Sequence, residues 1–312
     1  MNILRQFLLA LSHNAQAQDL IAAVPMARRA AQRFVPGEHL EDAVVAIRQL
    51  NNQGILTTVD FLGEYVASEA EARSNADEYL RLLDAIQAHG LQSHVSVKLT
   101  AMGLHIGDDF CYDNVRRIAA KAAAIGSFMR IDMEDSAVTS RTLDIYRRMR
   151  AEFETVGIVL QAYLYRTQQD MTALINEDLA RVRLCKGAYD EPPTVAFPSK
   201  AEVDANMITL LGQTLAASQQ HPKGVYLAVA SHDSRMIDWT KAYAYHNQIP
   251  RDRYEFQMLY GIRRDLQLAL AKKGYTMRVY VPYGTAWYGY FMRRLAERPA
   301  NLVFFLRALV GQ

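Results

Sequence analysis

Two adjacent arginines near the C-terminal end of the sequence have neighbours that suit the binding of a carboxylate. In the segment GTAWYGYFMRRLAERPAN, the helical spacing i, i+3, i+4 and i+7 is occupied by Tyr290, Arg293, Arg294 and Glu297. These side chains would share one face of a helix. Because a guanidinium binds a carboxylate through two parallel hydrogen bonds, an arginine pair beside a tyrosine makes a clamp for an acidic ligand.

The same pattern has a plainer interpretation, in which this helix face is exposed to solvent and Arg293 pairs with Glu297. Such a surface pair contributes only ~0.3–0.5 kcal/mol. The other sides of the helix favour a covered position because they are apolar, with Trp287, Tyr288, Phe291 and Met292. Both interpretations stay open on the sequence of this helix alone.

Further polar side chains lie at the ends of apolar segments that have the length of strands. They are Lys98 in SVKLT, Asp132 and Glu134 in RIDMEDS, Gln161 before AYLYR, Arg183 and Cys185 in RVRLCKGAY, and Ser231, His232 and Asp233 in ASHD. A guanidinium inside a strand must be paired, because an isolated buried charge is very costly. Each residue alone also has a structural explanation: Lys98 could pair with Asp132, and His232 could cap the following helix.

The residue types exclude several chemistries and favour an anionic ligand. The sequence has no GxGxxG after a strand, no P-loop, no HExxH and no GxSxG. The cations Lys98 and Arg183 argue against a metal ion at the carboxylates, and they suit a phosphate or a carboxylate. Gly187 begins a loop whose backbone can approach a large cofactor closely, and Lys200 opens the next helix at a position that suits a phosphate.

Strand-length apolar segments alternate with amphipathic stretches from Gly54 onward, which is typical of parallel strands joined by helices. Eight strands are predicted at residues 55–61, 94–99, 128–132, 157–162, 181–186, 225–230, 254–259 and 277–281. Helices are expected between them, for example at 69–88, 113–125, 139–154 and 201–218. Eight such units favour a closed (βα)8 TIM-like barrel over an open doubly wound sheet, and they place the active site at the carboxyl-terminal ends of the strands.

The region before the first strand is predicted to be helical, with helices at 3–34 and 38–51 separated by Pro36-Gly37. We expect residues 1–53 to pack as an N-terminal helical segment on a catalytic barrel formed by residues 54–312. The chain would then be one α/β domain overall.

Composition limits the classes of function. Of 312 residues, 35 are basic and 33 acidic, and a net charge of +2 gives no reason to expect nucleic acid. Two cysteines, Cys111 and Cys185, argue against a disulfide scaffold. No apolar run reaches the ~18 residues of a membrane-spanning helix, and the run near the N-terminus is too short for a secretion signal. We expect a soluble protein of a reducing compartment.

Together, these segments resemble the proline dehydrogenases, in particular the short monofunctional bacterial type. The matching segments are SVKLT, RIDMEDS, LQAYLYRT, RLCKGAY, ASHD, YEFQMLYG and YVPYGTAWYGYFMRRLAERPAN, in the family's order over residues 50–310. The resemblance implies a distorted (βα)8 barrel that binds FAD without a Rossmann fold. It also implies oxidation of L-proline to 1-pyrroline-5-carboxylate by hydride transfer to FAD. The electrons would pass to a quinone, as the first step of proline catabolism to glutamate.

The resemblance implies roles for individual residues, with Asp132 and Arg183 as the catalytic pair. For the substrate, it implies carboxylate binding by Arg293, Arg294 and Lys98, a pocket wall of Asp132, Tyr280, Tyr290 and Leu259, and support of the clamp by Glu297. For the flavin, it implies Arg183 beside N5, Gln161 at the pyrimidine end, Lys186, Gly187 and Ala188 along the ribityl chain and pyrophosphate, and Lys200 at a phosphate. Ser231 and His232 would lie near the adenosine, and Met133 would pack near the flavin.

Cys185 and Asp190 depart from the pattern, because the large bifunctional relatives have a small aliphatic residue and a tryptophan there. Those relatives also carry a DNA-binding module and an aldehyde dehydrogenase domain, which a chain of this length is expected to lack. Quinone use implies a cytoplasmic protein in peripheral contact with the inner face of the cell membrane. Two rival functions are a lyase or aldolase with Lys98 as Schiff-base nucleophile, and a binding protein without activity. Neither predicts the Tyr290–Glu297 face together with RLCKGAY.

Overall fold

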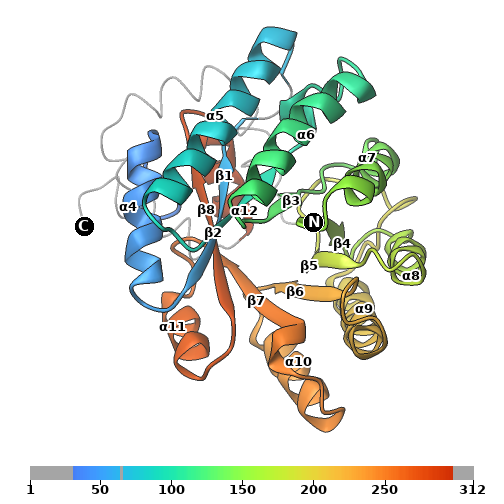
Figure 1. Cartoon of the computed structure of the whole chain (residues 1–312). Coiled ribbons are helices and arrows are strands. Elements are labelled where there is room, and N and C mark those ends of the chain that lie inside the picture. The colour runs from blue at the N-terminus through green and yellow to red at the C-terminus, as the bar shows by residue number, and fades with distance from the viewer. Residues whose placement is uncertain (1–30, 64–65, 298–312) are drawn as a thin grey trace.

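The computed structural model describes residues 31–63 and 66–297, and for residues 296 and 297 it describes the backbone only. Within these residues, parallel strands pair in sequence order and the last pairs with the first, so the sheet closes into a barrel (Figure 1). The strands are β1 (Leu56–Phe61), β2 (Ser93–Val97), β3 (Met129–Ile131), β4 (Val156–Gln161), β5 (Arg181–Cys185), β6 (Tyr226–Ala230), β7 (Tyr254–Leu259) and β8 (Met277–Tyr283). The predicted eight-stranded barrel is confirmed, and the open sheet is excluded.

Helices follow the strands and surround the barrel (Figure 1). They are α4 (Leu40–Asn51), α5 (Glu69–Ala88), α6 (Asp108–Ala124), α7 (Thr139–Glu152), α8 (Thr167–Asn176), α9 (Lys200–Gln220), α10 (Ser234–His246), α11 (Arg264–Lys272) and α12 (Trp287–Glu297), with short 3-10 turns η1 (Thr100–Met102) and η2 (Arg251–Arg253). The predicted first and last residues of the strands agree with the observed ones within two residues. Helix α6 begins five residues before its predicted start, because Asp108 and Asp109 favour the positive end of the helix dipole.

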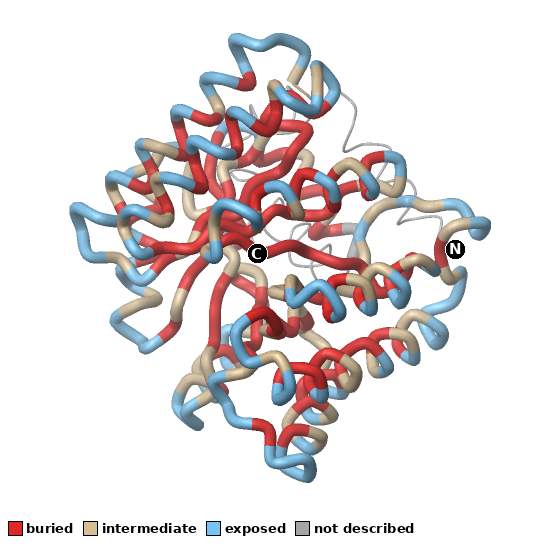
Figure 2. The backbone as a smooth tube through the Cα atoms, turned by 45° about the vertical axis from the view of Figure 1, so that its right-hand side comes forward, coloured by how far each residue is buried: buried red, intermediate tan, exposed pale blue. Residues whose placement is uncertain are grey.

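Helix α4 lies against β1 and β8, on the outside of the barrel (Figure 1). The helix predicted at 3–34 lies almost entirely outside the described residues, so the predicted packing of residues 1–53 as one segment stays a prediction. Figure 2 shows that burial is concentrated in the strands and on the inner sides of the helices, whereas their outer sides are exposed.

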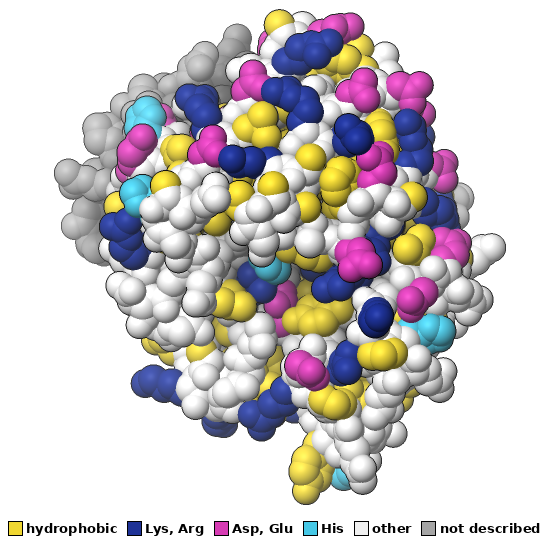
Figure 3. All heavy atoms as spheres, viewed as in Figure 1, with side chains coloured by type: hydrophobic (Ala, Val, Ile, Leu, Met, Phe, Trp, Pro, Cys, Tyr) yellow, Lys and Arg dark blue, Asp and Glu magenta, His cyan; other side chains and the backbone are white. Residues whose placement is uncertain are grey.

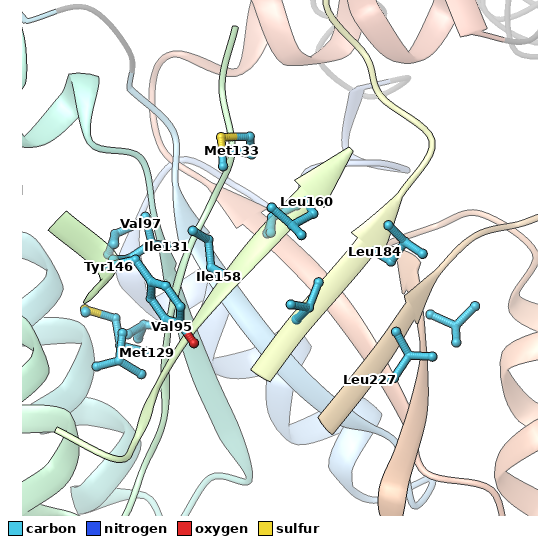
Figure 4. Packing of buried hydrophobic residues seen from close by; sticks show 14 of the residues in the cluster. Val95, Val97, Met129, Ile131, Met133, Tyr146, Ile158, Leu160, Leu184 and Leu227 are labelled. Atoms are coloured by element: carbon cyan, nitrogen blue, oxygen red, sulfur yellow. The ribbon is translucent and has the colours of Figure 1, made fainter. Parts of the chain in front are cut away.

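Side chains alternate between the two faces of each strand. Arg183 of β5 reaches Ser96 of β2, so these residues point into the barrel. Their neighbours in sequence therefore point outward, and Val95, Val97 and Leu184 belong to the apolar core between strands and helices (Figure 4). The same core includes Tyr146 of α7 (Figure 4). Apolar packing thus holds the helices outside, and polar side chains are left for the barrel interior.

Charged side chains fill the lower part of the interior, toward the amino-terminal ends of the strands. The Glu255 carboxylate on β7 accepts hydrogen bonds from Arg278 Nε at 2.9 Å and Nη2 at 3.1 Å, and from the Tyr226 hydroxyl at 3.2 Å. Arg130 on β3 donates to two backbone carbonyls of β4 and β5. Burial and the nearby Arg278 charge lower the pKa of His94 on β2 well below its usual range. This charged layer forms a floor beneath the carboxyl-terminal strand ends.

Candidate active site

Asp132, directly after β3, is the centre of a buried hydrogen-bond network. Its Oδ1 accepts hydrogen bonds from Ser96 Oγ at 2.7 Å and Arg183 Nη1 at 2.8 Å, and its Oδ2 accepts from the Tyr280 hydroxyl at 2.9 Å. Lys98 Nζ lies 3.9 Å from the same Oδ2. The residues come from β2, β3, β5 and β8 and meet across the interior. The structure therefore brings together Lys98, Asp132, Arg183 and Tyr280, as expected from the sequence.

Lys98 lies closer to Asp60 on β1 than to Asp132, and the sequence analysis did not single out Asp60. Lys98 Nζ lies 2.6 Å from Asp60 Oδ2, and the Asp60 side chain is fully buried. The ion pair considered between Lys98 and Asp132 is thus longer than the pair between Lys98 and Asp60. A carboxylate inside the apolar segment TTVDF was the available signal, because it has the same strand-end position as the other polar residues.

Burial and the Asp132 charge together raise the pKa of Tyr280 well above its usual range. The phenol therefore keeps its proton and donates it to Asp132 in a hydrogen bond. Burial likewise raises the pKa of Asp60, while the Lys98 ammonium opposes that shift. The result is a compact cluster of two carboxylates, one ammonium and one guanidinium, whose formal charges cancel.

On helix α12, Tyr290 and Arg294 are buried, which excludes the interpretation of a fully solvated helix face. The Arg294 guanidinium carbon lies 5.0 Å from the centre of the Tyr290 ring. Tyr290 belongs to a buried apolar group against which Leu259 and Tyr280 pack. Arg293 is half-buried on the same helix. The side chain of Glu297 lies outside the described residues, so its supporting role stays a prediction.

A second charged cluster links the end of β5 to the starts of α9 and α10. Lys186 Nζ contacts Asp204 at 2.5 Å and Asp233 at 2.9 Å, and Arg235 Nη2 contacts the same two carboxylates at 2.7 and 2.9 Å. Lys200 also pairs with Asp204. Lys200 is the first residue of α9, as predicted. Sequence reasoning missed Arg235, because its contacts depend on the packing of α10 beside α9.

Gln161 and Gly187 stand at the ends of β4 and β5. Gln161 Nε2 donates to the Glu134 carbonyl at 2.7 Å, and Glu134 accepts a hydrogen bond from Thr100 N at 3.0 Å. Gly187 has φ +119°, and a Cβ atom there would lie 2.2 Å from the Tyr163 ring, so this conformation requires glycine. The close approach seen at Gly187 is to Tyr163. The predicted approach of the 187–188 backbone to a cofactor stays a prediction.

Ser231 and His232 follow β6, but neither caps the next helix. The N-cap of α10 is Asp233, whose side chain accepts a hydrogen bond from Arg235 N at 3.1 Å. The capping role considered for His232 is therefore wrong: an aspartate reaches the first helical N–H groups more easily. His232 Nε2 instead accepts from Leu259 N at 3.0 Å and ties β6 to the end of β7. Met133 is buried within the main apolar core (Figure 4).

No group of three metal-ligating His, Cys, Asp or Glu side chains occurs among the described residues. None of the described helices is long and apolar enough to cross a membrane. On the face seen in Figure 3, basic and acidic side chains are interspersed, so this face carries no extended basic surface.

Fold and site define a (βα)8 barrel that carries a buried cluster of charged side chains, among them Lys98 and Arg183, toward the carboxyl-terminal ends of its strands. Comparison with protein families gives a match to the Proline dehydrogenase model over residues 43–307. The chain belongs to the proline dehydrogenase family.

Similar proteins agree with this assignment. Proline dehydrogenase 1 of Bacillus subtilis (strain 168) is 44% identical over 309 residues, which cover 99% of each chain. Proline dehydrogenase of Deinococcus radiodurans is 45% identical over 286 residues, or 90% of each chain. Among solved structures, proline utilization A from Bdellovibrio bacteriovorus, inactivated by N-propargylglycine, has a TM-score of 0.82 at 26% identity. That match covers 95% of this chain but 36% of the other, so this chain spans about a third of that structure.

Proposed function

We propose that this protein oxidises L-proline to 1-pyrroline-5-carboxylate with FAD and passes the electrons to a quinone, as the first step of proline catabolism to glutamate. The observation that carries the proposal is the buried network of Lys98, Asp132, Arg183 and Tyr280, together with the buried Arg294 of α12. We further propose that the protein is cytoplasmic and meets its quinone in peripheral contact with the inner face of the cell membrane.

The residues at the strand ends fit a flavin. The buried side-chain atoms without a hydrogen-bond partner among the described residues include Arg183 Nε and Gln161 Oε1, which both lie on strands of the barrel. A buried donor and a buried acceptor without partners are costly, so a ligand with complementary groups is expected there. An isoalloxazine offers an acceptor at N5 and a donor at N3, which match these two atoms. Lys186, Lys200 and Arg235 are the cations that suit the pyrophosphate.

The clamp residues determine how proline lies in the site. Arg294, Arg293 and Lys98 would bind the carboxylate, so that the carbon on the other side of the ring nitrogen faces the cofactor. FAD, when bound, supplies the acceptor for the hydride that leaves this carbon. Holding reacting groups in one orientation can lower a barrier by up to ~7–11 kcal/mol. Burial of the surrounding side chains keeps water away from the site.

Asp132 acts by orienting its neighbours rather than as a free base. Its two oxygens accept hydrogen bonds from Ser96, Arg183 and Tyr280, so both are already used as acceptors. It fixes the Arg183 guanidinium and the Tyr280 phenol in place. Both would then form rigid walls of the pocket.

The contact between Lys98 and Asp60 disfavours the rival lyase. A Schiff-base lysine must lose its proton, and a carboxylate 2.6 Å away stabilises the ammonium instead. Lys98 therefore suits the binding of a carboxylate better than nucleophilic attack.

The rate of oxidation is expected to rise with pH. The ring nitrogen must be neutral so that its lone pair stabilises the iminium that forms as the hydride leaves. Stopped-flow measurement of the chemical step from about pH 6 to about pH 9 should show this rise. A flat profile over that range would contradict the mechanism.

The experiment that tests the proposed function is an absorbance spectrum of the purified protein, followed by anaerobic addition of L-proline. A flavin spectrum that bleaches with proline is the expected result. Yellow protein that proline does not bleach would support a flavin cofactor and would show that the substrate is not proline. Colourless protein that does not take up added FAD would overturn the proposal. Trapping of a substrate on Lys98 by borohydride would then favour the lyase.

A further inference from the structure

Gln161 ends β4 on the inner face of the barrel, with one end of its amide bonded and the other end open. Val159 pairs in register with the inward-pointing Arg183 of β5, so Gln161, two residues further along β4, points inward as well. Its Nε2 donates to the Glu134 backbone carbonyl at 2.7 Å, whereas its buried Oε1 has no donor among the described residues. A buried acceptor without a donor is costly, so it marks a place where a ligand supplies one.

The Glu134 carbonyl determines which end of the amide is open. A carbonyl oxygen only accepts hydrogen bonds, so it binds the NH2 group of Gln161 and repels the amide oxygen. A flipped amide would bring two oxygens into contact and would turn its NH2 group toward the ligand. At the end of β4 the protein therefore presents an acceptor to a ligand, and not a donor.

The side chain of Glu134 holds the segment that carries this carbonyl. Its carboxylate accepts hydrogen bonds from Thr100 N at 3.0 Å and from Thr100 Oγ1. Both residues are buried, with Glu134 1% exposed and Thr100 fully covered. The contact ties the segment after β3 to η1, which follows β2, and the Gln161 amide extends it to β4. Glu134 thus links three neighbouring strands at their carboxyl-terminal ends.

We propose that Glu134 is a positioning residue, which fixes the Gln161 amide through its hold on Thr100 and so makes the protein select a flavin that carries a hydrogen at N3. The proposal rests on the proposed function, because it takes the ligand at the end of β4 to be the pyrimidine edge of a flavin. Glu134 does not touch the flavin in this account. It acts through Gln161, which accepts the N3–H.

A fixed amide should discriminate strongly at N3. Methylation of N3 removes the donor and places a methyl group against the Gln161 oxygen, and an amide that is held in place cannot turn away from it. Thr100→Val removes the hydroxyl donor from the Glu134 carboxylate, so the Glu134 carbonyl is held less firmly and the amide can turn. FAD then binds more weakly, and 3-methyl-FAD is tolerated better. A general loosening of the fold would instead weaken the binding of both flavins equally.

The test measures the dissociation constants of FAD and of 3-methyl-FAD for the flavin-free chain, from the quenching of flavin fluorescence. In the wild type, the Kd for 3-methyl-FAD should exceed that for FAD by ~100-fold, as expected when a buried acceptor loses its donor. In Thr100→Val this ratio should fall to ~10, the change that one hydrogen bond accounts for. Thr100→Ser keeps the hydroxyl and should keep the wild-type ratio.

The matched control is Thr214→Val. It removes an equally buried hydroxyl, whose partner is the Leu210 carbonyl within α9 at 2.8 Å, and should leave the ratio unchanged. If Thr100→Val does not fold, Thr100→Ala removes the same hydroxyl without adding a methyl group, and the same fall in the ratio is expected.

A second background separates action through Gln161 from other effects of the Thr100 hydroxyl. In Gln161→Leu the amide is gone, so Thr100→Val should not change the ratio any further. An unchanged ratio in Thr100→Val, equal binding of both flavins by the wild type, or an effect of Thr100→Val that persists in Gln161→Leu would overturn the inference. A wild type that binds neither flavin would instead count against the proposed function.

Discussion

Replacement of Arg294 by methionine should raise the KM for proline by ~10- to 100-fold, since each charge-assisted hydrogen bond contributes ~1.5–3 kcal/mol. Methionine keeps much of the volume of this buried side chain and of its contact with the Tyr290 ring, while it removes the guanidinium. Flavin content should stay at the wild-type level, because the residues proposed for the flavin lie on β4, β5 and the starts of α9 and α10. Steady-state kinetics and the flavin-to-protein absorbance ratio check both points.

A matched control is Arg251→Met at the opposite end of the barrel. Arg251 is exposed, and its guanidinium carbon lies 4.3 Å from the centre of the Tyr275 ring. Like Arg294 it contacts an aromatic ring, but it lies far from the site. Its replacement should leave the KM unchanged. An unchanged KM in Arg294→Met would remove Arg294 from the clamp.

The largest effect on stability is expected for Glu255→Gln in the charged floor of the barrel. The substitution leaves the buried Arg278 guanidinium without its carboxylate partner, and loss of one member of such a pair costs ~3–5 kcal/mol. Urea unfolding monitored by circular dichroism measures this loss. The control Glu69→Gln breaks an exposed pair with Arg73 at 3.4 Å, and should change the free energy of unfolding by less than ~1 kcal/mol. A similar small change for Glu255→Gln would show that the floor does not stabilise the fold.

The Glu255–Arg278 pair also makes the stability of the fold depend on pH, in a direction that the pKa of Glu255 determines. Burial alone would raise the pKa of Glu255, but the Arg278 guanidinium, with smaller contributions from His94 and Gln257, outweighs burial and lowers this pKa from its ordinary 4.5 to about 2. A carboxylate with a lowered pKa in the folded state stabilises the fold above its unfolded pKa. This stability is lost as the pH falls from about 4.5 toward about 2. In Glu255→Gln, the free energy of unfolding should therefore fall less between about pH 4.5 and about pH 2 than it does in the wild type.

The sequence predicts the barrel well because strands and helices have local periods. Apolar segments of strand length alternate with helical stretches, and eight such repeats leave few alternatives to a closed sheet. The site residues Lys98, Asp132 and Arg183 could be identified from the sequence for a related reason, because each is a charged residue in an otherwise apolar segment. Such a charge needs a partner, and the strand ends of a barrel bring these partners together.

Local sequence patterns do not show which side chain each charged residue contacts. The shorter contact of Lys98 is with Asp60, which lies 38 positions earlier and reaches it through the pairing of β1 with β2. Arg235 joins Asp204 only because α10 packs beside α9. Such contacts depend on register and on helix packing, both of which are set by the whole fold.

The charged floor also determines where the protein can be attached to a support. Glu255 and Arg278 are buried beneath the strand ends, so the site residues lie on the side of the floor that faces away from the turns before the strands. Those turns include Gly90 and Gly126, both exposed, whose φ of +59° and +69° favours glycine, so an insertion beside them suits the backbone better than their replacement. A cysteine or a peptide tag placed in these turns would anchor the enzyme to an electrode with its site facing the solution.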